Sequence, residues 1–436
     1  MADKFHFECN DCRAEYPGDR LIYLCPVCEA ANIPGQPPKG VLKTLYNYAE
    51  IRRLSPSAGL FDKLRGQSFI PLLPLRGLDS CPGLRIGETP LYRVTRWTSG
   101  QVDRWTGGQA DKRIGDFEVF VKDDSQNPTF SFKDRASALV SAWARENGIT
   151  TLVAASTGNA GSSLAGICAS QGQRAIIVAP AAAPLAKLTQ ILMYGATLVP
   201  VQGTYDDAYD LSVRITANYG WYNRNTAYNP LTIEGKKTVA CELFSQLGNN
   251  VPDRVFIPVG DGVIFSGVCK GFEDLLKLGI IDRMPVLVGV QAIGSSNLIN
   301  NLDHEKFVAV SSKTIADSIS VDVPRCFHMT AGYIKKYKGE MITVSDSEIL
   351  QASLQMARFT GIFCEPAAAA AFAGILKYRD QGLIPAGSKN VVLATGSGLK
   401  DLASVQSSIR IPEPVGTDFG EVERLFAKEY LTGNNH

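Results

Sequence analysis

Short apolar runs alternate with longer segments of helical periodicity along most of the chain. The runs lie at residues 152–154, 175–178, 197–201, 255–257 and 286–290. Runs this short and apolar are typical of strands covered on both faces, which is the environment of a parallel sheet. The alternation therefore predicts an α/β fold, with parallel or mixed sheets covered by helices.

Segments outside this alternation carry signals of their own. Residues 42–54 show the apolar spacing of an amphipathic helix, whereas the prolines within residues 69–75 exclude a central strand. The run Ser345-Asp346-Ser347-Glu348 predicts a capping box that opens a helix ending near Gly361. Proline and glycine at residues 33–40 predict a boundary in the chain.

One lysine stands where a predicted helix begins. Lys133 lies in residues 127–135, shortly after the β-type run at residues 117–122. Burial among apolar neighbours lowers the pKa of an amine, which can then condense with a carbonyl group. The alternative is a first-turn lysine that extends to water while Asp134 interacts favourably with the helix dipole. The segment alone leaves both interpretations open.

Three further segments run from a strand end through a small-residue turn into a helix, at residues 154–166, 257–267 and 391–401. Glycine and serine allow a ligand to approach the backbone, and the free amides at a helix start can bind an anion. Any one of these turns is also typical of an ordinary strand-to-helix connection.

Taken together, these motifs resemble the threonine synthase group of fold-type II pyridoxal phosphate enzymes over residues 86–402. The motifs that carry the resemblance are Asn127-Pro128, Ser131-Phe132-Lys133-Asp134, Ser156-Thr157-Gly158-Asn159, the loop at residues 260–266, and Thr395-Gly396-Ser397-Gly398-Leu399-Lys400-Asp401. The resemblance implies a two-lobed fold with pyridoxal phosphate between the lobes. Lys133 is then expected to bind the cofactor and to remove the substrate's α-proton.

The resemblance also implies roles for other residues. The expected cofactor-binding residues are Lys133, Asn159, Gly260, Asp261, Gly262, Val263, Ile264 and Thr395, and the expected substrate-binding residues are Ser156, Thr157 and Gly158. Asn159 would bond the ring oxygen, unless it is only a helix N-cap. Thr395 would face the pyridine nitrogen, unless it only caps a turn. The Asp261 carboxylate is expected to turn away from the cofactor phosphate, because like charges repel.

The chain departs from the family pattern where the substrate is held. Thr232 replaces the arginine that usually grips the substrate phosphate, and Phe130 replaces a glycine, which predicts a narrower pocket. Replacements for the arginine can be sought among Lys187, Arg224, Lys236 and Lys237, although each fits a solvated surface charge better. Glu365 fits the start of a helix as well as a site residue.

Three reactions follow from the resemblance. The first is threonine synthase chemistry, in which O-phosphohomoserine and water give threonine and phosphate. The alternative is cysteate synthase, which converts O-phosphoserine and sulfite to cysteate and phosphate, and whose shorter substrate would explain the missing arginine. A threonine or serine dehydratase-like activity is third. A regulatory module without catalysis is disfavoured by the intact Lys133.

Composition restricts the remaining choices. The chain has 436 residues and a net charge of +1, which gives no general attraction to nucleic acid or membranes. It has no long apolar run and no apolar core typical of a signal peptide at its start, so we expect a cytoplasmic protein, in the family's usual form of a homodimer.

The ten cysteines fall into two kinds. Cys9, Cys12, Cys25 and Cys28 form two Cys-x-x-Cys pairs typical of structural zinc sites, while the other six are scattered. Loss of the metal, or disulfides, would be the alternative. The expected parts of the chain are a zinc-ribbon-like segment (1–40), an N-terminal arm (41–90), a large lobe (91–140 and 223–410), a small lobe (141–222) and a tail (411–436).

Overall fold

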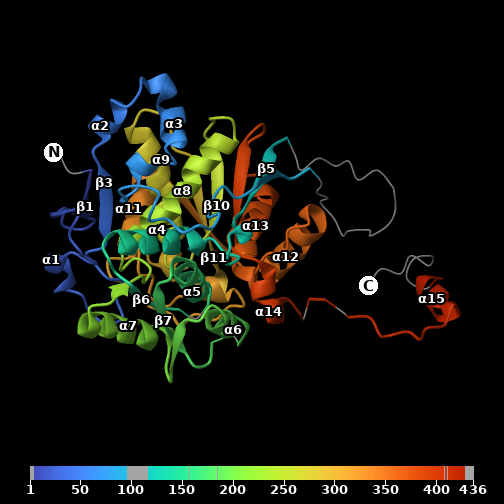
Figure 1. The fold of residues 1–436 in the computed structure, drawn as a ribbon. Helices are drawn as coiled ribbons and strands as arrows, with labels where there is room; N and C mark the ends of the chain where they lie inside the picture. Colours follow the sequence, from blue (N-terminus) through green and yellow to red (C-terminus); the bar gives the residue numbers. More distant parts are fainter. Residues whose placement is uncertain are drawn as a thin grey trace.

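Three β-sheets organise the part of the chain that the structure describes (Figure 1). The structure is a computed structural model, and it describes residues 4–95, 116–156, 158–183, 185–406, 408–409 and 411–427. The N-terminal sheet has the order β2-β1-β3 and is antiparallel. A six-stranded sheet has the order β12-β11-β10-β13-β5-β4 and is parallel except for β4, and a parallel four-stranded sheet has the order β8-β7-β6-β9.

The strands are β1 (Phe5–Cys9), β2 (Glu15–Pro17), β3 (Leu42–Tyr46), β4 (Leu91–Arg93), β5 (Glu118–Asp123), β6 (Thr151–Ala155), β7 (Arg174–Pro180), β8 (Thr197–Val201), β9 (Tyr222–Asn223), β10 (Arg254–Pro258), β11 (Val286–Ala292), β12 (Glu340–Val344) and β13 (Lys389–Ala394). The helices are α1 (Pro26–Glu29), α2 (Tyr48–Arg52), α3 (Ser57–Gly66), α4 (Lys133–Glu146), α5 (Asn159–Gln171), α6 (Leu185–Met193), α7 (Tyr205–Tyr219), α8 (Leu231–Gln246), α9 (Val263–Lys277), α10 (Asn297–Asn300), α11 (Phe327–Tyr337), α12 (Asp346–Thr360), α13 (Pro366–Asp380), α14 (Leu402–Gln406) and α15 (Phe419–Phe426). No described helix is long and apolar enough to cross a bilayer.

Strand β10 shows why the predicted apolar runs become buried strands. Successive side chains of a strand point to opposite faces of the sheet. Val255 and Ile257 pack into the core that contains α8 and α9, whereas Phe256 packs into the core that contains α13. Both faces of the sheet are therefore covered, and the predicted α/β fold class is confirmed.

The amphipathic helix expected at residues 42–54 is wrong in its first half. Residues Leu42–Tyr46 form strand β3, which pairs with β1 in antiparallel register. Pairing with that strand buries the segment, and this tertiary contact outweighs the helical spacing of its apolar residues. The helix α2 begins only after Asn47, whose side chain caps it. The capping box at Ser345 is confirmed, with both of its hydrogen bonds present and α12 ending before Gly361.

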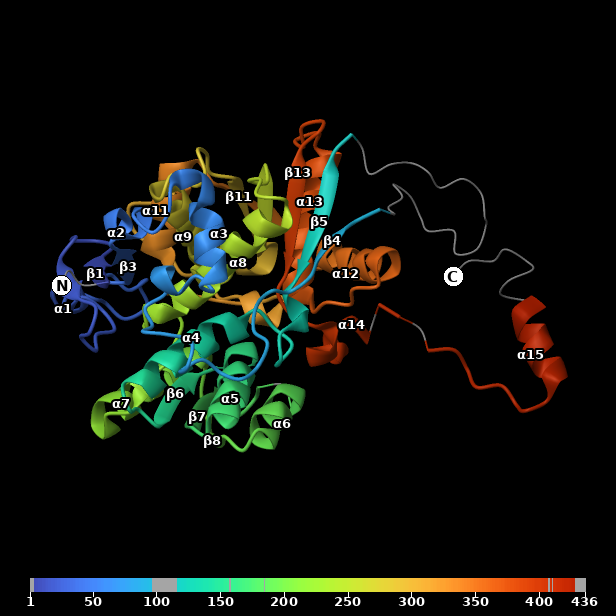
Figure 2. The same cartoon turned by 45° about the horizontal axis from the view of Figure 1, so that its top comes forward.

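The two larger sheets lie in different parts of the molecule, as both views show (Figures 1 and 2). The four-stranded sheet is surrounded by α5, α6 and α7, and α4 lies between it and the helices α8 and α9 in the ribbon (Figure 2). Helices α12 and α13 pack on the six-stranded sheet. The helix α15 lies apart from the rest of the described chain in both views.

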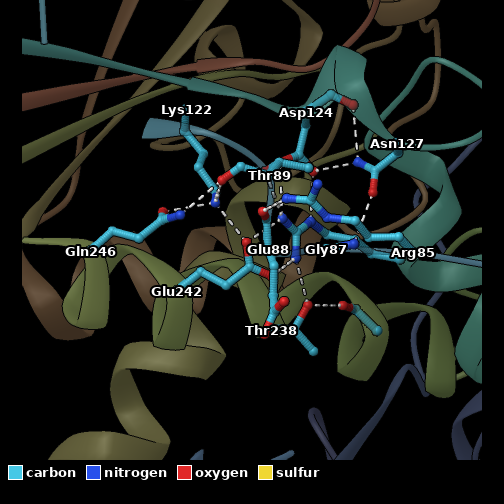
Figure 3. Close-up of polar contacts among 12 residues, drawn as sticks. Arg85, Gly87, Glu88, Thr89, Lys122, Asp124, Asn127, Thr238, Glu242 and Gln246 are labelled. Atoms are coloured by element: carbon cyan, nitrogen blue, oxygen red, sulfur yellow. Dashed lines mark hydrogen bonds and ion pairs between the residues drawn. The ribbon is translucent and has the colours of Figure 1, made fainter. Parts of the chain in front are cut away.

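A buried ionic network connects the first turn of α4 to β5 and α8 (Figure 3). The guanidinium of Arg135 forms a two-bond ion pair with Asp124, at 2.6 and 2.9 Å, and also pairs with Glu242. Lys122 donates to Glu242 at 2.6 Å. Two acids thus balance two bases, and the network fixes where α4 begins.

Candidate active site

A cavity of about 280 Å³ lies where the starts of α4, α5 and α9 meet. Its walls come from the β6–α5 turn, the β10–α9 turn, the segment at residues 317–321 and one residue of α8. Of the residues expected from the sequence, those lining the cavity are Lys133, Ser156, Gly158, Asn159, Gly260, Asp261, Gly262, Val263 and Ile264. Thr157 lies outside the described residues.

Lys133 is the first residue of α4, and its side chain lines the cavity. Burial lowers the pKa of its amine, and the nearby Arg224 guanidinium lowers it further. This is the environment that favours a neutral, nucleophilic amine. The placement supports the nucleophile interpretation over that of a lysine extending into bulk water.

The β10–α9 turn presents the free backbone amides of α9 to the cavity. Gly262 takes a φ of +85°, and a Cβ there would lie 2.2 Å from Thr330 Oγ1. A Cβ at Gly260 would lie 2.9 Å from the Cα of Ile319. Both positions therefore require glycine, because the turn packs too closely against Ile319 and Thr330 to admit a side chain at either one.

Asp261 turns toward α11 and not toward the amides of α9. Its Oδ1 accepts a hydrogen bond from the backbone N–H of Arg325 at 3.0 Å, and its carbonyl accepts one from Cys326. Burial raises the pKa of the Asp261 carboxyl. The expectation that this carboxylate bonds to backbone is confirmed.

We expect Gly262→Ala to weaken binding of a phosphate-bearing cofactor and to destabilise the fold by more than about 1–2 kcal/mol, the cost of left-handed backbone strain alone, because the added Cβ would also clash with Thr330 Oγ1. Gly279→Ala is the matched control, since Gly279 has a φ of +71° but no atom within 4 Å of the added Cβ. Urea unfolding and cofactor titration of both variants measure the two effects. Equal losses in the two variants would contradict the steric role of Gly262.

Asn159 is the first residue of α5 and makes no N-cap bond, so the N-cap interpretation is wrong. Its Nδ2 donates to Glu365 Oε1 at 2.7 Å and to Ser318 Oγ at 3.1 Å, while its Oδ1 is buried without a partner. Glu365 is buried at the N-cap of α13, and burial raises the pKa of its carboxyl. The three side chains join α5 to the segment at residues 317–321 and to the start of α13.

Thr395 and Phe130 do not line the cavity in the described part of the chain. The carbonyl of Thr395 accepts a hydrogen bond from the backbone N–H of Phe132 at 2.8 Å, which attaches the end of β13 to the start of α4. Phe130 takes a φ of +67° and is half exposed, so the expected narrowing of the pocket is wrong. The family's glycine suits this left-handed backbone.

The four cations proposed as replacements for the missing arginine are not surface charges, which corrects the expectation from sequence. Lys187, Arg224, Lys236 and Lys237 are each at most 3% exposed. Lys187 pairs with Asp317, and Lys237 pairs with Glu234 and Asp274. Among the described residues, neither Arg224 nor Lys236 has a carboxylate within ion-pair distance.

Sequence reasoning missed several cavity residues, namely Tyr205, Thr226 and residues 317–321. Residues 317–321 belong to no glycine turn and show no periodic pattern, so the sequence carried no signal for them. Tyr205 opens α7 directly after Thr204, whose capping box with Asp207 was recognisable. That pattern could have predicted the helix, but not that its first residue reaches the cavity.

Comparison with known proteins agrees with this geometry. Residues 84–396 match the family described as pyridoxal-phosphate dependent enzyme. The threonine synthase of Methanocaldococcus jannaschii is 32% identical over 426 residues, covering 96% of this chain and 98% of that protein. The threonine synthase of Synechocystis sp. is 38% identical over 339 residues, covering 77% and 82%.

Solved structures show the same fold at lower identity. O-ureido-L-serine synthase has a TM-score of 0.60 at 21% identity, covering 78% of this chain and 97% of that one. Threonine deaminase isoform 2 from Solanum lycopersicum has a TM-score of 0.58 at 24% identity, covering 67% and 82%. The fold, the motifs and the full-length similarity agree, and the chain therefore belongs to the pyridoxal phosphate-dependent enzymes, as a lyase of the threonine synthase group.

Proposed function

We propose that this enzyme converts O-phosphohomoserine and water to threonine and phosphate, with Lys133 as its catalytic residue. The observation that carries the proposal is that the Lys133 amine, with its lowered pKa, shares one cavity with the free amides of α9. An amine and an anion-binding site in the same cavity suit a cofactor that has both an aldehyde and a phosphate group. The similarity to threonine synthases supports the choice of reaction.

The residues around the cavity fit pyridoxal phosphate. Gly260 and Gly262 let the β10–α9 turn pack closely against Ile319 and Thr330, which holds the amides of α9 at the cavity. The Oδ1 of Asn159 is buried without a partner, and the Nδ2 of the same amide is 2.7 Å from the Glu365 carboxylate, which holds the amide at the cavity wall. Lys133 supplies the amine that the cofactor's carbonyl carbon requires.

Bound pyridoxal phosphate supplies an electron sink for the substrate's α-carbon. The amides of residues 260–264 would bind its phosphate, and Asn159 would orient its ring. The Nζ of Lys133 would hold the cofactor at rest and, once released by substrate, would take the α-proton. Ser156 and the backbone at Gly158 would bind the substrate carboxylate, because this turn lines the cavity at the start of α5. The buried walls would keep bulk water from the reacting carbon.

Product analysis tests the proposal. The purified holoenzyme is incubated with O-phosphohomoserine, and in parallel with O-phosphoserine plus sulfite, while phosphate release and the amino-acid product are measured. Threonine with stoichiometric phosphate from the first substrate supports the proposal. Cysteate from the second substrate, without threonine from the first, would replace it with the cysteate synthase alternative. An oxo acid and ammonia would indicate a dehydratase.

We also propose that Cys9, Cys12, Cys25 and Cys28 bind a structural zinc ion. Their sulfur atoms all lie within 4.8 Å of one another, with Cys9–Cys28 at 3.8 Å and Cys12–Cys25 at 3.6 Å. Zinc–sulfur bonds of about 2.3 Å place tetrahedral ligands about 3.8 Å apart, which these distances approach. Disulfide bonds require about 2.05 Å, and all four cysteines are free.

The zinc site is predicted to stabilise the enzyme beyond its own segment. The N-terminal segment reaches the β9 region, where Tyr23 Oη accepts a hydrogen bond from Asn223 N and the Tyr23 ring stacks on Tyr228. We expect Cys12→Ser to release the metal and lower the melting temperature, measured by elemental analysis and calorimetry. Cys81→Ser, outside the cluster, is the control. Full metal content and unchanged melting of Cys12→Ser would contradict the proposal.

A further inference from the structure

Lys236 carries a buried amine that no described carboxylate pairs with. Its side chain lines the cavity and is fully buried, and its one hydrogen bond runs from Nζ to the carbonyl oxygen of Thr232 at 3.2 Å. An isolated buried ammonium is strongly unfavourable unless a counter-charge accompanies it. The structure therefore contains a buried amine whose protonated form requires an anion that no described side chain supplies.

Two further basic side chains act against protonation of the Lys236 amine. Arg224 is buried, and its hydrogen bonds to described residues all go to neutral oxygens, those of Ser137, Thr226 and Lys133. Burial, Arg224 and Lys133 together lower the pKa of the Lys236 amine well below its usual value. The Cys326 thiol and, after it, the Asp261 carboxylate favour the protonated form of this amine, and the Oδ1 of Asp261 already accepts a bond from the backbone N–H of Arg325. One carboxylate thus stands near three basic side chains, those of Arg224, Lys236 and Lys133.

The position of the Lys236 ammonium matches the residue that the chain lacks. Thr232, in the place of the family's arginine, is buried, and its hydroxyl donates to the carbonyl of Asn229 at 2.8 Å. Helical side chains lean toward the helix N-terminus, so a lysine at position 236 extends back to the level of position 232. The hydrogen bond from Lys236 Nζ to Thr232 O shows this reach directly.

Lys187 and Lys237 cannot supply the missing charge in the same way. Asp317 neutralises Lys187 at 2.6 Å, and Asp274 neutralises Lys237 at 2.7 Å. The amides of α9 form an anion seat in the β10–α9 turn, which suits the cofactor phosphate. With the cofactor phosphate on those amides, an anion beside Lys236 would be a second one in the same cavity, and within the proposed function it would be the phosphate of the substrate.

We propose that Lys236, assisted by the charge of Arg224, binds the phosphate of the substrate in place of the arginine that Thr232 replaces. This inference rests on the proposed function for the identity of the anion, but the anion site itself can be tested without turnover. Phosphate is a product of the proposed reaction, so inorganic phosphate is a suitable probe of the site.

The test is calorimetric titration of the holoenzyme with inorganic phosphate, in which the cofactor's own phosphate seat is already filled. We expect Lys236→Met to weaken phosphate binding by roughly ten- to 100-fold, as for loss of a charged hydrogen bond. Lys236→Arg should retain most of the affinity because it keeps the charge. Lys63→Met, on the exposed face of α3, is the control. Cofactor content and visible absorbance of all variants should match those of the wild type.

Unchanged phosphate affinity in Lys236→Met, or no saturable binding by the wild-type holoenzyme, would overturn the proposal. Loss of the cofactor from Lys236→Met would also overturn it, by assigning the lysine to the cofactor phosphate. If Lys236→Met loses phosphate binding but the wild type does not turn over O-phosphohomoserine, the anion site stands and the proposed substrate is wrong. The two failures are thus distinguishable.

Discussion

Lys133→Ala is expected to lower turnover by at least about 10³-fold, since the side chain would act both as nucleophile and as base. The variant should also lose the visible absorbance of covalently attached cofactor. The fold should survive, because the substitution removes a partly buried amine that no described carboxylate pairs with. Steady-state kinetics, absorbance spectra and thermal unfolding measure the three effects.

Lys133→Arg tests whether the side chain acts through its positive charge or through its neutral amine. Arginine retains a cation at the start of α4 but does not lose its proton at neutral pH, so it cannot act as nucleophile or base. We expect this variant to be as inactive as Lys133→Ala. If Lys133→Arg instead keeps near-wild-type turnover, Lys133 contributes only charge and the proposed mechanism is wrong.

Glu242→Gln is expected to destabilise the enzyme by about 3 kcal/mol or more, because it leaves Arg135 and Lys122 buried with Asp124 as their one remaining acid. The loss should reach the active site, since Arg135 lies two residues after Lys133 in the first turn of α4. Urea unfolding measures the stability. Glu50→Gln removes an exposed ion pair and should cost less than about 1 kcal/mol. Equal losses of unfolding free energy in the two variants would show that the buried network stabilises the fold no more than an exposed ion pair does.

The same network predicts that the stability of the enzyme falls at acidic pH. Burial alone would raise the pKa of Glu242, but Arg135 and Lys122 lower it to about 2. A carboxyl with a lowered folded-state pKa contributes stability that is complete above its unfolded pKa, near 4.3, and is lost as pH falls toward the folded value. The wild type should therefore lose stability between about pH 4.3 and 2 more steeply than Glu242→Gln does. If the stability of the wild type and of Glu242→Gln fell in parallel with pH, the lowered pKa of Glu242 would be contradicted.

The sequence predicted correctly those helices and strands whose signals lie in adjacent residues. The run at residues 197–201 became β8 with the same bounds, and Ser345 caps α12 as its spacing required. Lys133 begins α4 as expected, because the strand–turn–helix signal is contained in adjacent residues. The ordered motifs likewise identified the turns that meet at the cavity, since each motif carries its own glycines.

Features that depend on distant contacts could not be read from the sequence. Residues 42–46 form a strand because β1 pairs with them, and no local signal announces that partner. The burial of Lys236 and Arg224 results from packing of α8 and β9 around the cavity, whereas lysine and arginine are usually exposed. Residues 317–321 reach the cavity only through the fold.

We predict that Lys133 is the residue that holds pyridoxal phosphate. Borohydride reduction of the purified holoenzyme, followed by proteolysis and mass spectrometry, identifies the lysine that carries the cofactor. We predict one modified peptide, with the cofactor on the Nζ of Lys133. Lys236 is a stringent internal competitor, because its amine lines the same cavity and its pKa is also lowered. Cofactor attached to Lys236, or no attached cofactor at all, would contradict the account.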